Sequence, residues 1–135
     1  MFKKIFSIIL TGIISIMVLG NVVSASEIAP MALYTYSSSS TLTISEATAT
    51  CTSKATGYSG ETTKIVISQV LQKKTSSGTW SSVSSWSETD TGYIGSATNK
   101  KSSLSNGTYR LKTVFTVYAG TNFEEITKYS TEKTI

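Results

Sequence analysis

Histidine is absent from the 135-residue chain, and this absence excludes the most familiar catalytic and metal-binding arrangements. Ser-His-Asp and Cys-His catalysis both need an imidazole base, and histidine is also a common zinc or copper ligand. Carboxylates are paired at Glu88 and Asp90 and at Glu124 and Glu125, but hydrolysis by two carboxylates needs a cleft between them. No pattern in the sequence indicates a cleft. We therefore expect no enzyme activity, no cofactor and no metal site.

Cysteine is nearly absent as well, since Cys51 is the one thiol in the chain. A single cysteine forms no intrachain disulfide, which leaves a buried thiol, a bridge between two chains or a free reactive group. Cys51 lies between two threonines in a strand-like context, and burial is the commonest fate of an unpaired cysteine. The sequence therefore predicts a buried thiol and a fold held by packing alone.

The one long apolar run lies at the amino terminus. Lys3 and Lys4 precede mostly apolar residues 5–19, and small residues at 23–25 match a signal-peptidase site. The run is shorter than the roughly 18 to 20 residues that a membrane span requires, which disfavours the alternative of a retained anchor. We expect residues 1–25 to be a cleaved signal-peptide helix, residues 26–33 a flexible lead, and residues 34–135 a secreted domain without a stable membrane span.

Charged residues are sparse, at 15% of the chain. Removal of residues 1–25 would leave ten basic and eight acidic side chains, and so weak a positive charge is not typical of nucleic-acid binding. Lysine pairs at 73–74 and 100–101 fit either anionic cell-wall polymers or the charged edges that protect strands from pairing. The second interpretation is favoured, and the pairs are assigned no partner.

What the sequence does contain is β-strand alternation. Its longest instance is residues 109–118, in which every second side chain from Tyr109 to Val117 shares one face. Further segments between turn residues predict strands at 41–44, 47–55, 63–73, 80–86, 92–101 and 123–134. The serine- and threonine-rich stretches 37–41 and 81–87 alternate with β-branched and aromatic residues and are interpreted as strand surface. The less favoured alternative is disorder, which would lie within 34–44. No stretch after residue 25 has the periodicity of a capped helix.

A tyrosine-corner signature precedes the longest strand. In Leu104-x-x-Gly107-x-Tyr109, the tyrosine at the start of a strand can return its hydroxyl to the backbone upstream. Together with about seven short strands, this motif predicts an all-β fold, an antiparallel immunoglobulin-like or fibronectin-like sandwich. Its predicted core consists of Cys51, Ile65, Ile67, Leu71, Tyr109, Leu111, Phe115 and Val117.

Two tryptophans are the candidate ligand contacts. Trp80 and Trp86 are six residues apart, so strand parity places both on one face, roughly 20 Å apart. Spaced flat rings can stack on sugars, whereas a sandwich tryptophan more often fills the core. Residues 81–85 contain few core-forming side chains, and a β-bulge there would turn one ring outward. We therefore predict that one ring packs in the core and the other stays accessible to a partner.

One resemblance spans roughly residues 60–118, where LQKK, SSGTW, SSVSSW and LSNGTYRLKTVFTVY follow in order. This succession resembles a group of small exported β-sandwich proteins of Gram-positive bacteria that are catalogued as a domain of unknown function. In that group, a strand ending in Leu-Gln-Lys-Lys precedes a Gly-Trp hairpin, a second Trp and a Gly-x-Tyr-Arg strand. The resemblance implies an exported β-sandwich without an assigned activity, and it supplies no catalytic residues.

Two classes of function remain. The first is a secreted, non-catalytic binding or interaction module for a cell-surface glycan or a protein. The alternative is a secreted antimicrobial or toxin-like effector, because a small, weakly basic, exported protein also fits that role. Membrane activity would need an exposed apolar surface or an amphipathic segment, and the sequence pattern indicates neither. The first class is therefore favoured.

Overall fold

The computed structural model describes residues 32–135, and the predicted signal-peptide helix and residues 26–31 of the predicted lead lie outside the described residues. No helix that could cross a membrane occurs in the described part. Eight strands follow one another: β1 (Thr35–Ser45), β2 (Thr48–Gly57), β3 (Lys64–Lys74), β4 (Trp80–Thr91), β5 (Ile94–Lys101), β6 (Thr108–Ala119), β7 (Asn122–Tyr129) and β8 (Lys133–Thr134).

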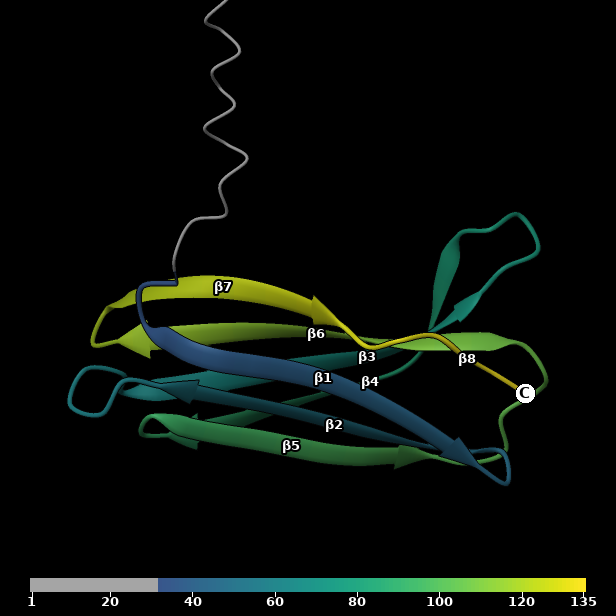
Figure 1. Ribbon diagram of the computed structural model, residues 1–135, viewed down its shortest axis with the longest axis horizontal. Coiled ribbons are helices and arrows are strands. Elements are labelled where there is room, and N and C mark those ends of the chain that lie inside the picture. The colour runs from purple at the N-terminus through teal and green to yellow at the C-terminus, as the bar shows by residue number, and fades with distance from the viewer. Residues whose placement is uncertain (1–31) are drawn as a thin grey trace, which may run out of the picture. The chain divides into compact units, whose positions relative to one another are not determined.

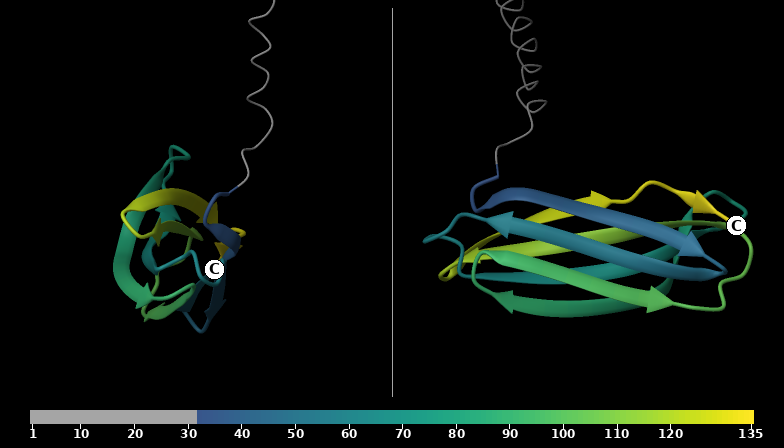
Figure 2. Two further views of the ribbon diagram at one scale, coloured as in Figure 1. Left: turned by 90° about the vertical axis from the view of Figure 1, so that its left-hand side faces the viewer. Right: turned by 60° about the horizontal axis from the view of Figure 1, so that its bottom comes forward.

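The strands form two antiparallel sheets that pack face to face (Figure 1). One sheet has the order β1-β2-β5, and the other has the order β4-β3-β6-β7 with β8 beside β6. Figure 2 shows β1, β2 and β5 side by side in front of the second sheet. The chain changes sheet between β2 and β3, between β4 and β5, and between β5 and β6. The predicted sandwich is confirmed, and the position of β4 beside β3 makes it fibronectin-like.

The core follows the alternation in the sequence. β3 and β6 are interior strands of their sheet and pair with each other along residues 64–73 and 109–118, so their inward side chains are covered on all sides. All eight predicted core residues have at most 1% of their surface exposed: Cys51, Ile65, Ile67, Leu71, Tyr109, Leu111, Phe115 and Val117.

Two strands differ from the prediction. β1 begins at Thr35 instead of Thr41, because the serine-rich residues 37–40 pair with β2, so these serines are strand surface as expected and the alternative of disorder in 34–44 is wrong. The predicted strand at 123–134 is interrupted at Ser130. Its N–H donates to the Leu111 carbonyl (2.9 Å), and its Oγ accepts from the Leu111 N–H (2.8 Å). The side chain of Ser130 thus completes the pairing with β6 and divides the segment into β7 and β8.

A layer of polar side chains crosses the middle of the core. The buried Gln69 donates from Nε2 to Ser53 Oγ (2.7 Å) and accepts at Oε1 from Asn99 Nδ2 (2.7 Å). Ser53 Oγ lies 2.7 Å from Thr113 Oγ1, which lies 2.9 Å from Ser40 Oγ. Five strands contribute to this layer, and no buried side-chain nitrogen or oxygen within residues 32–135 lacks a partner. Such a network fixes the register of one sheet against the other.

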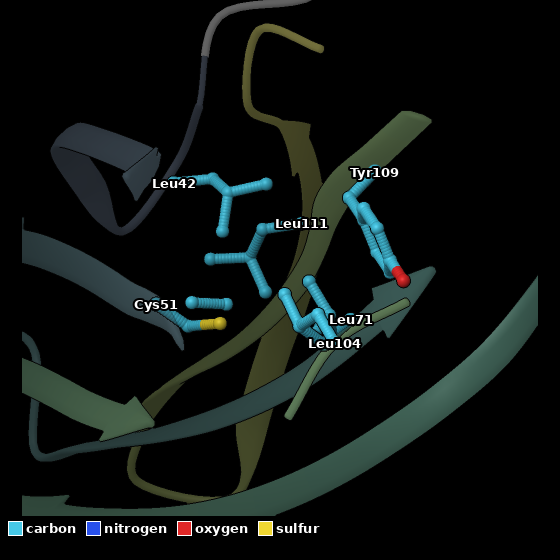
Figure 3. Packing of buried hydrophobic residues seen from close by; sticks show 7 residues of the cluster. Leu42, Cys51, Leu71, Leu104, Tyr109 and Leu111 are labelled. Carbon is cyan, nitrogen blue, oxygen red and sulfur yellow. The ribbon is translucent and has the colours of Figure 1, made fainter. Parts of the chain in front are cut away.

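The polar layer separates two apolar clusters. The first, shown in Figure 3, consists of Leu42, Ala49, Cys51, Leu71, Leu104, Tyr109 and Leu111. The second consists of Ala55, Ile65, Ile67, Ala97, Phe115 and Val117. Each half of the sandwich therefore has a core of its own, although β2, β3 and β6 contribute buried side chains to both clusters.

The tyrosine corner closes the first cluster. The Tyr109 hydroxyl donates to the Ser105 carbonyl (2.7 Å), and Leu104 is buried beside it. Gly107 adopts a φ of 152°, which favours glycine, and exchanges two backbone hydrogen bonds with Ile135 (2.9 and 3.0 Å). The loop between β5 and β6 is thereby tied both to the core and to the end of the described chain.

Candidate functional site

A β-bulge in β4 separates the environments of the two tryptophans. The pairing of β4 with β3 skips Val83, because Ser84 and Ser82 lie opposite consecutive residues of β3. Side chains alternate between faces along a strand, so one extra residue reverses the face of everything beyond it. Trp80 and Trp86 therefore lie on opposite faces of the sheet. The bulge expected within residues 81–85 is present, and it overrides the strand parity that would place both rings on one face.

Each ring then has its own role in the packing. Trp86 lies opposite the buried Gln69 and packs, partly buried, against the cluster around Tyr109. Trp80 lies opposite Lys74 on the outer face of the sheet. A sugar platform formed by the two rings along β4 is therefore ruled out by the bulge, and the two tryptophans have no common ligand surface.

Trp80 belongs to a stack of aromatic and cationic side chains on the outer face. The Arg110 guanidinium carbon lies 4.2 Å from the ring centres of both Trp80 and Tyr129, and its Nε donates to Gln72 Oε1 (2.7 Å). Lys74 Nζ lies 5.7 Å from the Trp80 ring centre. Cation–π contacts of this kind stabilise the outer face. Arg110 therefore occupies one face of each ring, although Tyr129 remains 49% exposed.

Cys51 is a structural thiol. Its side chain is fully buried, and burial raises the pKa of the thiol to about 11. At neutral pH the thiol is therefore protonated, and the thiolate is the form that attacks electrophiles and binds metals. The position of Cys51 suits neither a nucleophile nor a bridge to a second chain.

The paired carboxylates also have structural contacts. Asp90 Oδ2 accepts a hydrogen bond from the Ser96 N–H (2.9 Å), which links β4 to the edge of β5. Glu124 and Glu125 point to opposite faces of β7, as successive strand residues do. Within residues 32–135, no three His, Cys, Asp or Glu side chains gather as a possible metal site.

Exposed apolar side chains gather at one end of the sandwich. Eight large apolar side chains within residues 32–135 are exposed, and six of them lie where β1 starts and where β2–β3, β4–β5 and β6–β7 connect: Leu33, Tyr36, Tyr58, Tyr93, Ile94 and Phe123. We call this the tyrosine end, which is on the left in Figure 1. Gatherings of exposed apolar side chains are typical of surfaces that contact another molecule. The expectation of no exposed apolar surface is therefore wrong.

The rings of the tyrosine end form two pairs. Tyr36, which is 72% exposed, meets Tyr58 edge to face, with ring centres 6.1 Å apart and planes at 75°. On the outer face of the other sheet, the centres of Tyr118 and Phe123 are 5.5 Å apart, and Lys64 Nζ lies 4.2 Å from the Tyr118 ring centre. The aromatic surface thus extends over the ends of both sheets.

Thr63 joins the three connections of this end to one another. Its N–H donates to the Tyr118 carbonyl (2.7 Å), and its own carbonyl accepts from the Gly92 N–H (2.7 Å). Its Oγ1 accepts from the Gly120 N–H (3.0 Å). The turns that carry Tyr93 and Phe123 are therefore held to the β2–β3 loop by hydrogen bonds, and a surface fixed in this way loses little freedom on binding.

The start of β1 is fixed to the same end. Glu124 accepts hydrogen bonds from the Leu33 and Tyr34 N–H groups and from Thr35 Oγ1, each at 2.8 Å. Desolvation favours the neutral acid, but these hydrogen bonds to the charged form outweigh it and lower the pKa of Glu124. Thr62 Oγ1 also donates to the Tyr34 carbonyl (2.7 Å). The exposed side chains of Leu33 and Tyr36 thus flank an anchored backbone.

The sequence interpretation missed the tyrosine end. Its signal is an aromatic residue shortly after a glycine at a strand end or in a turn, as at Gly57 and Tyr58, Gly92 and Tyr93, and 120–123. An aromatic ring in a turn has no strand face on which to be buried. Whole strands separate the three connections along the chain, however, and only the topology brings them to one end.

Comparisons with known proteins assign no family. The chain matches no protein-family model and no curated protein. Among solved structures, it is similar to the solution structure of R. palustris CsgH, with a TM-score of 0.41 and 12% sequence identity, over 68% of this chain and 87% of that chain.

Proposed function

We propose that the protein is a secreted, non-catalytic binding module and that its contact surface is the tyrosine end. One observation carries this proposal: six of the eight exposed large apolar side chains of residues 32–135 lie at that end. Tyrosine and phenylalanine are enriched at protein interfaces, where their rings bury much area and lose little conformational freedom. The hydrogen bonds through Thr63 and Glu124 keep the surface in one conformation before it meets a partner.

The chemistry of this end favours a protein over a glycan. Sugar sites combine a stacking ring with convergent polar side chains, but Asp90 and Glu124 already accept hydrogen bonds from the chain itself. The exposed surface that remains consists of aromatic and aliphatic side chains with the carboxylates of Glu61, Glu88 and Glu125 around them. Five carboxylates and two lysines lie on this side of the polar layer: Glu61, Glu88, Asp90, Glu124, Glu125, Lys54 and Lys64. The complementary partner is therefore a protein surface with apolar pockets and a basic rim.

Site-specific photocrosslinking tests the proposal. A photoreactive side chain would replace Ser59, in the β2–β3 loop, or Ser77, in the β3–β4 turn at the opposite end; both positions are exposed. Protein purified from the medium of an expressing culture would be irradiated with bacterial cells and with spent medium. We expect one discrete protein adduct from position 59 and none from position 77.

A binding measurement on the crosslinked partner then assigns the residues. Tyr58→Ser should weaken that complex by about tenfold or more, because a central interface aromatic often contributes about 2 kcal/mol. Its unfolding free energy should change by less than about 0.5 kcal/mol, since the ring lies on the surface. Equal adducts from positions 59 and 77, or unchanged affinity in Tyr58→Ser, would contradict the proposal.

A further inference from the structure

Cations from both sheets gather at the end opposite the tyrosine end. We call the part of the domain on this side of the polar layer the basic end. Four strands contribute seven cations to it: Lys73, Lys74, Lys100, Lys101, Arg110, Lys112 and Lys133. The β3–β4 turn, the end of β5, β8 and the carboxyl terminus all lie there, on the right in Figure 1. The two lysine pairs of the sequence, which are 26 residues apart at their nearest members, thus belong to one surface.

Few carboxylates balance these charges. Glu46 and Glu132 are the acidic side chains on this side, and the pair Lys74–Glu132 (3.9 Å) is the one ion pair within residues 32–135. The basic end therefore has a formal side-chain charge of plus five, whereas the tyrosine end has minus three. A weakly basic total charge conceals this separation, which creates a positive field at one end of the domain.

Several of the cations are held in place. Lys73 and Lys133 lie on either side of Tyr109 in neighbouring strands, and Lys73 Nζ donates to Ser105 Oγ (2.7 Å). Arg110 is fixed between its two rings. The exposed lysines of β5 lie on the other sheet. The charges are thus distributed over the ends of both sheets.

This distribution selects the kind of anion. A small anion needs convergent donors, whereas a flexible polyanion contacts dispersed cations one after another and releases a counterion at each contact. Single-stranded nucleic acids also stack their bases on open aromatic rings, but here Arg110 covers one face of both Trp80 and Tyr129. We propose that the basic end binds a flexible linear polyanion that carries no stacking bases, such as a phosphate polyester.

The test measures binding of synthetic poly(glycerol phosphate) to the purified protein at several salt concentrations. For a single-stranded polyanion the slope of log K against log salt is about −0.7 per phosphate contact, so five contacts predict about a hundredfold weaker binding at 200 than at 50 mM salt. Lys100→Gln with Lys101→Gln should weaken binding at low salt by about tenfold or more.

Lys54→Gln with Lys64→Gln is the matched control, because it removes two charges from the other end. Binding should stay within about twofold of the unchanged protein, since charges separated by more than about 10 Å are screened at 0.1 M salt. Equal effects of the two double variants would overturn the proposal, as would tighter binding of a single-stranded oligonucleotide of equal charge. The protein could instead fail to bind the polymer and self-associate in a way that Lys100→Gln with Lys101→Gln abolishes. That result would overturn the proposal and indicate that the basic end binds the tyrosine end of a second copy.

Discussion

The two ends of this sandwich are built on the same strands, yet their surfaces are opposite in chemistry. At the tyrosine end, short turns fixed through Thr63 display aromatic rings beside carboxylates. At the basic end, strand termini and a protruding turn display lysines around a stack of Arg110 with Trp80 and Tyr129. The strands set the distance between the surfaces. Residues at their termini set the chemistry of each surface independently.

The interior of the sandwich is also divided into two halves. The layer around Gln69 separates the cluster that ends in the tyrosine corner from the cluster beneath the tyrosine end. A continuous apolar core would tolerate sliding of one sheet over the other, whereas a hydrogen-bonded layer has one register. The relative position of the two contact surfaces therefore depends on a few polar side chains at the centre.

The largest effect is expected from truncation in either cluster. Ile67→Ala, beneath the tyrosine end, and Leu71→Ala, beneath the basic end, should each lower the unfolding free energy by about 2 to 5 kcal/mol, because both side chains are fully buried. β3 crosses both halves, so each variant should still unfold in one cooperative transition in denaturant. Separate transitions by circular dichroism and tryptophan fluorescence would mean that the halves are independent units.

An intermediate effect is expected in the polar layer. Gln69→Leu removes the hydrogen bonds to Ser53 and Asn99 and should lower the unfolding free energy by about 1 to 3 kcal/mol, because buried partners lose their bonds. Gln72→Leu is the control on the outer face, where water can replace the lost contact, and its effect should stay below about 1 kcal/mol. Urea titrations compare the two, and equal losses would contradict a special role for the layer.

A smaller difference separates two tyrosine hydroxyls. Tyr109→Phe deletes the corner hydrogen bond to Ser105 and should reduce stability by about 1 kcal/mol. Tyr58→Phe at the other end should leave stability within about 0.5 kcal/mol of the original, because the ring is exposed. If the two denaturation midpoints were alike, the corner would contribute no more than a surface aromatic.

The smallest effect concerns acid stability of the tyrosine end. The folded-state pKa of Glu124 lies below its unfolded value, so its contribution is complete above the unfolded pKa and is lost as pH falls through the folded pKa. Glu124→Gln should therefore be less stable than the original at neutral pH, with the gap closing as the pH falls into that acidic window. Thermal unfolding across this range measures the gap, and Glu125→Gln, on the opposite face of β7, controls for loss of charge. A gap that widens on acidification would contradict the assignment.

Much of the fold could be predicted from the sequence because burial follows strict alternation along β3 and β6. Ile65, Leu71 and Phe115 are examples, since each is an apolar side chain at an inward position of an interior strand. The extent of β1 was harder to predict, because serine occupies its inward and outward positions alike and hides the period. Ser40 faces inward because it completes the polar layer, which is a tertiary contact.

The candidate surfaces were less predictable. The serine-rich interval 81–85 indicates a bulge, but it gives no local signal that Val83 is the extra residue or that Trp80 is the ring turned outward. The tyrosine end requires turns from distant parts of the chain to meet, and the basic end requires β5 and β3 to finish at the same end of different sheets. Topology supplies these juxtapositions, and local patterning does not.

The most direct test of two separate contact ends compares two variants against two ligands. The two variants are Tyr58→Ser and the double variant Lys100→Gln with Lys101→Gln. The affinity of each variant would be measured for poly(glycerol phosphate) and for the partner protein that position 59 captures. We predict that Tyr58→Ser weakens only the protein complex and that the lysine variant weakens only polymer binding. A variant that weakened both interactions equally would contradict the assignment of separate functions to the two ends.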